Sequence, residues 1–209
     1  MTVQASGVNM PVVLLKDGAT QTKGRDAQKN NIAAAKIIAE IVRTSLGPRG
    51  MDKMLVDSLG DVTITNDGAT ILKEIDVQHP AAKMLVEIAK STDNEVGDGT
   101  TSVVVLAGAL LEQAESLLLQ DVHPTIIVDG YRKAATKAKE YIKDISDQVT
   151  PDDKSILLKI ANTSMQTKLV RRDSDKLADM VVKAVLAVAE KSGSNYTVDI
   201  DDIKVEKKS

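Results

Sequence analysis

Apolar residues recur at helical spacing along most of the chain. Between Asp26 and Thr44 they fall on one side of a helix with 3.6 residues per turn, at Ile32, Ala35, Ile38, Ala39 and Val42. The same spacing predicts further helices that begin at Asn66, His79, Ser102, His123, Ser155 and Ser174. The segment from Ser102 to Leu119 is apolar on almost every side, so we expect it at the centre of a helical bundle.

Shorter segments alternate polar and apolar residues and predict strands. Lys53–Asp57 and Asp61–Thr65 flank Ser58-Leu59-Gly60, which is typical of a β-hairpin. Further short strands are predicted at Pro11–Leu15, Tyr196–Ile200 and Ile203–Glu206. The fold class is therefore mainly α.

The second half of the chain contains a change in composition. The polar stretch Gln148–Asp153 predicts a domain boundary. Strands so close to Ser209 would leave sheet edges without a partner, so we expect a chain cut short before the fold is finished.

Composition excludes several classes of protein. Three Tyr, no Phe, no Trp and a net charge of −3 speak against a nucleic-acid binder, which needs aromatic platforms or a basic surface. The absence of Cys excludes disulfides and thiolate metal sites and agrees with a reducing cytoplasm. Met1–Met10 lacks the pattern of a signal peptide, and the longest apolar run, Val103–Leu111, falls short of the ~20 residues that cross a bilayer. We therefore expect a cytoplasmic protein with no nucleic-acid or membrane partner.

Candidate chemistry lies in three Gly-containing loops next to predicted helices: Leu46–Gly50, Thr65–Thr70 and Gly97–Ser102. Glycine lets a backbone approach a ligand closely, and the free N–H groups at a helix start favour an anion. Asp98 fits among phosphate-binding groups if Mg²⁺ bridges the carboxylate and the phosphate oxygens. Asp67 is a second acid that could hold the attacking water or a metal-bound water.

Plainer interpretations remain open for these residues. Asp67 and Asp98 could be N-caps, contributing ~1 kcal/mol each, although a cap does not need the glycines on both sides of Asp98. Leu46-Gly47-Pro48 could simply end a helix, and no Gly-Lys-Ser/Thr follows it, which rules out a P-loop. His79 and His123 each precede a proline at a helix start, so we predict structural turns and not metal ligands.

Long motifs carry a family resemblance. They are LGPRGMDKML (Leu46–Leu55), VTITNDGATIL (Val62–Leu72) and EVGDGTTS (Glu95–Ser102), with HPAAK from His79 and HPTII from His123. In this order they resemble the group II chaperonins, the family of archaeal thermosomes and the eukaryotic cytosolic chaperonin. The resemblance covers the chain from about Pro11 onward.

The resemblance implies a fold and a function. Residues 1–149 would be the first segment of an equatorial helical bundle with a β-hairpin stem, and 150–209 the first segment of a small α/β intermediate domain. The apical domain and the returning segments would be absent. The implied function is an ATP-dependent chaperonin subunit, in which ATP hydrolysis closes a ring around unfolded protein. The implied partners are same-family subunits in a stacked double ring.

The resemblance also implies roles for individual residues. ATP would be contacted by Leu46, Gly47 and Pro48, with Asp67 as an acid of the hydrolytic site and Gly68 beside it. The phosphate and Mg²⁺ loop would consist of Gly97, Asp98, Gly99, Thr100, Thr101 and Ser102, with Asp98 as the metal ligand. Lys168, together with Asn162–Met165, resembles a loop that senses the γ-phosphate.

Three interpretations of the activity of this chain stay open. The family's second hydrolytic acid and the rest of the nucleoside pocket belong to the returning segments, so the chain alone is expected to be a weak or inactive ATPase. It could instead be a non-enzymatic, truncated subunit that only makes ring contacts through the hairpin and the terminal strands. An unrelated helical scaffold remains only if all three loops are caps.

Overall fold

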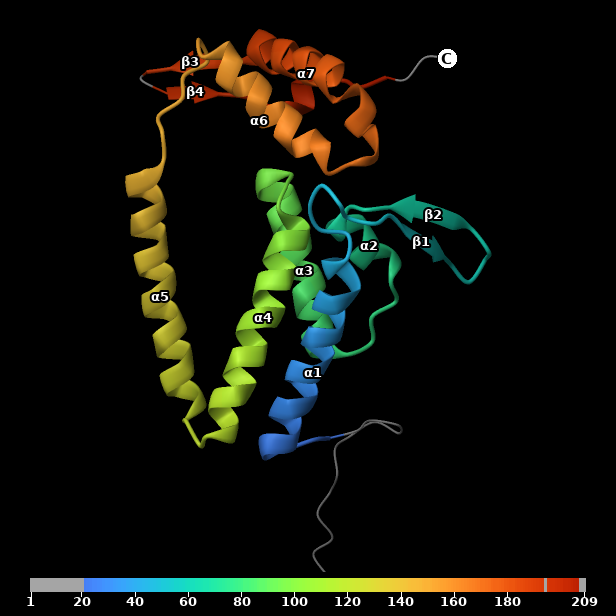
Figure 1. The fold of residues 1–209 in the computed structure, drawn as a ribbon, viewed down its shortest axis with the longest axis vertical. Helices are drawn as coiled ribbons and strands as arrows, with labels where there is room; N and C mark the ends of the chain where they lie inside the picture. Colours follow the sequence, from blue (N-terminus) through green and yellow to red (C-terminus); the bar gives the residue numbers. More distant parts are fainter. Residues whose placement is uncertain (1–20, 194, 207–209) are drawn as a thin grey trace, which may run out of the picture.

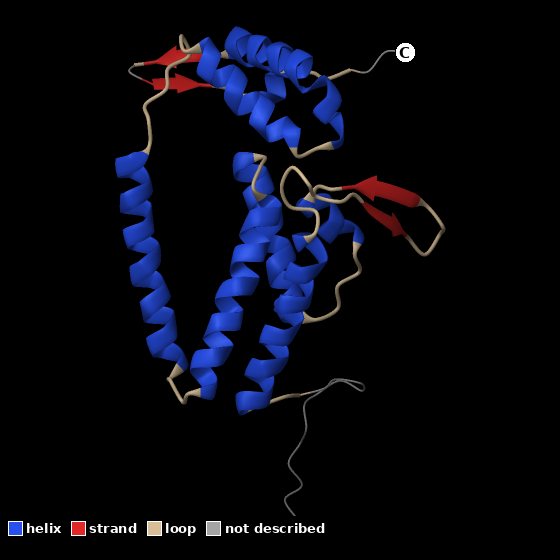
Figure 2. Cartoon of the chain, in the orientation of Figure 1, coloured by secondary structure: helices blue, strands red, loops and turns tan. Residues whose placement is uncertain are grey.

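The computed structural model describes residues 21–193 and 195–206, and within them the chain is mainly α, as predicted (Figures 1 and 2). The α-helices are α1 Gly24–Arg43, α2 Gly68–Glu74, α3 Pro80–Val96, α4 Thr100–Leu119, α5 Pro124–Ile145, α6 Lys154–Gln166 and α7 Ser174–Val188. Two 3₁₀ helices follow α6 and β4, η1 at Leu169–Asp173 and η2 at Ile200–Asp202. The strand predicted at Pro11–Leu15 lies outside the described residues.

The main core lies where α1, α2, α3 and α4 meet. All five apolar residues predicted for one side of α1 are buried, and Val42 is fully enclosed together with Ile71 of α2 and Val104 of α4. Gly108 lets α4 approach α1 closely, since a Cβ at this position would lie 2.3 Å from the Cβ of Ala39. Small residues thus set the contact between the two longest core helices.

Helix α4 is less enclosed than its apolar sequence predicts. Its side toward α1 and α3 is buried, whereas Leu106, Leu110 and Leu119 are exposed. Helix α5 turns back beside α4 but buries only Ile127 among its own residues (Figure 1). The expectation that α4 lies at the centre of a helical bundle is therefore wrong for these residues. Helix α5 reaches the outer side of α4 with a hydrogen bond from the Tyr131 hydroxyl to the Leu110 carbonyl at 2.6 Å, but it leaves the leucine side chains exposed.

The length and composition of α4 would also suffice to cross a membrane, in contrast to the expectation from Val103–Leu111 alone. It is the single helix of this kind among the described residues. One such helix is weak evidence for a membrane span, since the core helix of a soluble protein passes the same test.

The predicted hairpin is present. Strands β1 (Lys53–Val56) and β2 (Val62–Thr65) pair antiparallel, with Lys53 opposite Thr65 and Val56 opposite Val62. The Asp57 carboxylate closes the turn by accepting hydrogen bonds from the Leu59 and Asp61 N–H groups, both at 2.8 Å. The hairpin projects sideways from the bundle near α2 (Figure 1).

Helices α6 and α7 pack together with η1 over one end of the bundle (Figure 1). No helix or strand spans residues 146–153, between α5 and α6. The boundary predicted near residue 149 falls in this linker and stays a prediction.

Of the two predicted terminal strands, Tyr196–Ile200 overlaps the observed strand β4 at Tyr196 and Thr197, whereas Ile203–Glu206 is not a strand. Helix α7 ends at Val188, and β3 (Glu190–Ser192) pairs antiparallel with β4 (Asn195–Thr197). Gly193, with a φ of 65°, supplies the left-handed backbone that turns one strand into the other. After β4, the Asp199 side chain accepts a hydrogen bond from the Asp201 N–H at 3.0 Å and starts η2, so the predicted strand Tyr196–Ile200 ends early.

Candidate functional site

The three Gly-containing loops meet at the end of the bundle that faces α6 and η1 (Figure 1). The first follows α1, the second precedes α2 and the third joins α3 to α4. Residues from all three line a cavity of about 190 Å³, and the α6–η1 segment supplies its remaining wall. The lining residues are Ser45, Leu46, Gly47, Asn66, Asp98, Gly99, Thr100, Thr101, Ser102, Thr163, Thr167 and Lys168.

The Gly97–Ser102 loop is a tight corner between two helices. Gly97 ends α3 and Gly99 begins α4, with φ of 72° and 76°, a conformation that other residues rarely adopt. The first hydrogen bond of α4 runs from the Val103 N–H to the Gly99 carbonyl at 3.0 Å. The N–H groups of residues 100–102 therefore precede the helical ladder and are suited to bind an anion in the cavity.

Asp98 is not the N-cap of α4, since Gly99 holds that position and makes no side-chain cap. One Asp98 oxygen accepts the Gly99 N–H at 2.7 Å, and the other accepts the Ser164 hydroxyl of α6 at 2.9 Å. The plain capping interpretation therefore fails for Asp98. Its carboxylate lies on the wall of the cavity, where it can reach a bound ligand.

Asp67 caps α2 and also binds the chain from α6 to η1, residues 154–173 (the α6–η1 layer). One carboxylate oxygen accepts the N–H and hydroxyl of Thr70, both at 3.0 Å, and the other accepts Lys168 Nζ at 2.7 Å. Burial by itself would raise the pKa of Asp67, but the hydrogen bonds from Lys168 and Thr70 outweigh it and lower the pKa below the ordinary 3.8. Asp67 is therefore ionised at neutral pH.

Gly68 lets α2 and α4 touch at the site. A Cβ at this position would lie 2.4 Å from Thr101 Oγ1 and 2.8 Å from the Thr101 backbone nitrogen. Any side chain here would thus push the start of α4 away from Asp67. The role of Gly68 is to hold the two acidic loops together.

The segment from Ser164 to Arg171 contacts each of the three loops. Besides the bonds to Asp98 and Asp67, the Asn66 side chain donates to the Thr167 carbonyl at 2.6 Å and Arg171 donates to the Pro48 carbonyl at 3.3 Å. These partners are 66 to 123 residues apart in sequence. The site is therefore built jointly by the bundle and the α6–η1 layer.

Most of the predicted site residues share the cavity. Those on its wall are Leu46, Gly47, Asp98, Gly99, Thr100, Thr101, Ser102 and Lys168. Pro48, Asp67, Gly68 and Gly97 do not line it but lie directly beside residues that do. Asn66 and Thr163 also line the cavity, and both lie in segments that the sequence singled out, Thr65–Thr70 and Asn162–Met165. Ser45 and Thr167 were not predicted as lining residues, and no local pattern distinguishes them.

The described residues contain no group of three or more His, Asp, Glu or Cys side chains placed to hold a metal ion. The two histidines act as helix caps, since His79 and His123 Nδ1 accept the N–H groups of Ala81 and Thr125 at 3.2 and 3.3 Å. A divalent cation would therefore have Asp98 and the oxygens of its ligand as partners. This donor set fits Mg²⁺, which commonly binds one or two carboxylates together with phosphates.

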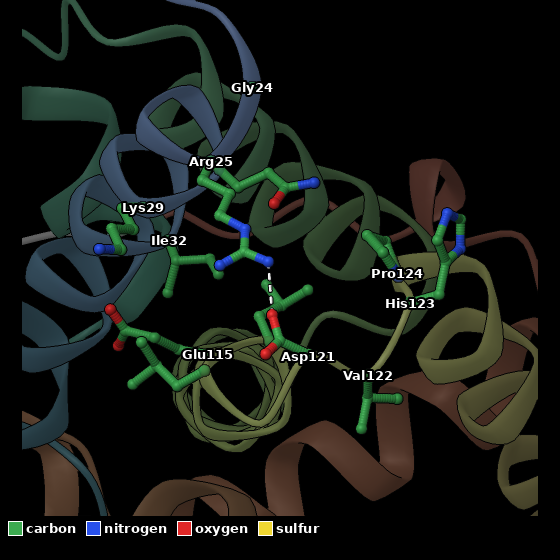
Figure 3. A pocket seen from close by; sticks show the side chains of 12 residues that line it. Gly24, Arg25, Lys29, Ile32, Glu115, Asp121, Val122, His123 and Pro124 are labelled. Atoms are coloured by element: carbon green, nitrogen blue, oxygen red, sulfur yellow. Dashed lines mark hydrogen bonds and ion pairs between the residues drawn. The ribbon is translucent and has the colours of Figure 1, made fainter.

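A larger cavity, of about 370 Å³, lies at the opposite end of the bundle. Figure 3 shows it between the start of α1 and the turn that leads into α5, crossed by an ion pair between Arg25 and Asp121. Two basic residues, Arg25 and Lys29, balance two acidic ones, Glu115 and Asp121. The charges give no preference for an anion, so size alone does not make this cavity the better phosphate site.

Comparison with known proteins agrees with the resemblance. The model of the TCP-1/cpn60 chaperonin family matches residues 38–209. The chain is 59% identical to the thermosome subunit beta of Archaeoglobus fulgidus over 198 residues and 55% identical to the thermosome subunit of Methanopyrus kandleri over 203. These alignments cover 95% and 97% of this chain but 36% and 37% of the relatives, so the chain spans little more than a third of their length. The chain belongs to the TCP-1/cpn60 chaperonin family.

Proposed function

We propose that this chain contributes the triphosphate-binding part of an ATP-dependent, protein-folding chaperonin subunit. The observation that carries the proposal is the convergence of three Gly-containing loops and Lys168 on one cavity. Three free N–H groups and three hydroxyls at the start of α4 suit phosphate oxygens, and Lys168 adds a positive charge.

Each acidic residue has a distinct role in this proposal. Asp98 would hold Mg²⁺, which neutralises phosphate charge when bound. Asp67, kept ionised by Lys168 and Thr70, would orient the attacking water. A γ-phosphate near Lys168 would compete with Asp67 for the ammonium group, so nucleotide binding would alter the contact between α2 and η1.

The size of the cavity suggests how much of ATP these residues bind. Small-molecule sites usually enclose about 300–1,000 Å³, whereas this cavity has about 190 Å³. It suits the phosphates better than the whole nucleotide. We therefore expect the 209 residues alone to bind Mg-ATP with little turnover, and steady-state phosphate release at the rate of a full-length family member would refute this.

The assembly partners follow from a separate observation. Hairpin β1–β2 exposes Met54, Val56, Leu59, Val62 and Ile64, the most exposed being Leu59 at 86%. An apolar hairpin that projects from the bundle suits pairing with strands of another chain. We propose same-family subunits, stacked in a double ring in the cytoplasm, as the partners and unfolded proteins as the clients. The non-enzymatic alternative shares these ring contacts but predicts no Mg-ATP binding.

The test is calorimetric titration of the chain with Mg-ATP. Asp98→Ala should weaken binding at least tenfold, since even groups that only orient a metal's ligands contribute about 10- to 100-fold. Asp144→Ala, which removes an exposed acid of α5, should leave binding unchanged. Equal affinity in the parent and Asp98→Ala would refute the role of Asp98, and no binding by the parent would favour the non-enzymatic alternative.

A further inference from the structure

One contact between the α6–η1 layer and the bundle has no role in the chemistry proposed above. Arg171 of η1 donates a hydrogen bond from Nη1 to the Pro48 carbonyl at 3.3 Å, across 123 residues of sequence. We propose that Arg171 is a positioning residue that holds the Leu46–Gly50 loop against the triphosphate cavity. The proposal rests on the proposed function, because it assigns the loop a contact with ATP.

The loop forms a hydrogen-bonded turn but is weakly attached to its surroundings. The Gly50 N–H donates to the Gly47 carbonyl and the Met51 N–H to the Thr44 carbonyl, both at 2.9 Å, so the backbone forms a closed turn. Leu46 is 43% exposed and Met51 60% exposed, so little apolar burial holds the turn in place. A turn with so little burial opens locally, and so breaks these two hydrogen bonds, more often unless an outside group fixes it.

Arg171 is placed to hold the Leu46–Gly50 turn in position. Leu46 and Gly47 face the triphosphate cavity, whereas Pro48 and Arg171 line a neighbouring cavity of about 350 Å³. The two cavities share Asn66, Thr167 and Lys168 as a common wall. A bond to the Pro48 carbonyl on one side therefore sets the position of Leu46 and Gly47 on the other.

Arg171 also ties the loop to the contacts made by its own segment. The same turn of chain carries Lys168, which binds Asp67, and Thr167, whose carbonyl accepts from Asn66. Ser164, in the preceding turn of α6, binds Asp98 of the third loop, so a shift of the segment Ser164–Arg171 would move all three loops at once. Arg171 extends this link to the Leu46–Gly50 loop, which among the described residues has no other hydrogen bond to the segment Ser164–Arg171.

Arg172 provides a matched control. It follows Arg171 in η1, carries the same charge and lines the same neighbouring cavity, but its side chain donates no hydrogen bond to the loop. A general electrostatic effect would therefore appear in Arg171→Gln and Arg172→Gln alike. A positioning effect would appear in Arg171→Gln alone, and Arg171→Lys, which keeps a donor, would restore part of it.

The first measurement is amide hydrogen exchange in the chain without nucleotide. Arg171→Gln should speed exchange at Gly50 and Met51 by about three- to tenfold, the range expected for the loss of one ordinary hydrogen bond, because this bond is long and solvent-exposed. Arg172→Gln should match the parent. Equal exchange in all variants would overturn the proposal, as would faster exchange that is spread over the whole bundle.

The second measurement is Mg-ATP affinity. Arg171→Gln should weaken binding by about three- to tenfold while its thermal midpoint stays at that of Arg172→Gln. Unchanged affinity in Arg171→Gln, with the parent binding normally, would refute the positioning role and leave the proposed function intact. If the parent does not bind Mg-ATP, the proposed function fails, while the exchange comparison still decides separately whether Arg171 holds the loop.

Discussion

Replacing Gly68 by Ala tests whether close contact between α2 and α4 builds the site. The new Cβ would lie 2.4 Å from Thr101 Oγ1, 2.8 Å from the Thr101 nitrogen and 2.9 Å from its Cα. The hydroxyl could rotate away, but the backbone atoms could not. The start of α4 would therefore have to move away from α2.

Two opposing effects decide the size of the change. Alanine in place of glycine stabilises a helix by up to about 1 kcal/mol, and less at the first position. Overpacking a close contact costs about 1–3 kcal/mol. We expect the free energy of unfolding to fall by about 1–2 kcal/mol, which lowers the thermal unfolding midpoint of a chain of this size by roughly 2–8 °C.

The shift should also reach the cavity, because Thr101 lines it. Loss of one well-placed hydrogen bond to a charged ligand costs about 1.5–3 kcal/mol, so Mg-ATP affinity should fall by about ten- to a hundredfold. Thermal unfolding and titration calorimetry measure the two effects on the same samples.

The matched control is Gly130→Ala in the middle of α5. A Cβ there meets nothing within 4 Å, so this change should stabilise the chain slightly and leave Mg-ATP affinity unchanged. If Gly68→Ala proves as stable as Gly130→Ala and binds Mg-ATP like the parent, the close contact has no role in the site.

Three further predictions concern the core, the ion pair between Asp67 and Lys168, and the ion pairs of Lys36. Ile71→Ala removes a fully enclosed side chain and should cost about 2–5 kcal/mol in urea unfolding; a cost near zero would contradict the packing of α2. The fold lowers the pKa of Asp67 below 3.8. The ionised Asp67 carboxylate therefore stabilises the folded chain fully above pH 3.8, and this contribution is lost as the pH falls through the folded pKa. The difference in free energy of unfolding between the parent and Asp67→Asn should accordingly narrow in acid. A difference that stays constant down to pH 2 would contradict the lowered pKa. Lys36→Gln removes partly exposed ion pairs with Glu112 and Glu115, in which the Lys36 side chain is 34% exposed. It should lower the thermal midpoint only slightly, because ion pairs with this much access to solvent contribute little.

The sequence by itself determined the local elements of this protein. The spacing of Ile32, Ala35 and Val42 predicted which side of α1 is buried, because a helix brings residues three and four apart onto one face. The hairpin and the three Gly-containing loops were also found, since the backbone conformations of Gly60, Gly97 and Gly99 depend on their own residue type.

Only the tertiary structure decided what these elements contact. Periodicity identifies an apolar side but not its partner, so it did not predict that α4 leaves Leu106 and Leu110 exposed. Likewise, no local pattern joins Lys168 to Asp67, Ser164 to Asp98 or Arg171 to Pro48. These pairs exist because α6 and η1 pack over the end of the bundle, and the positions of whole helices are set by the summed packing of many residues.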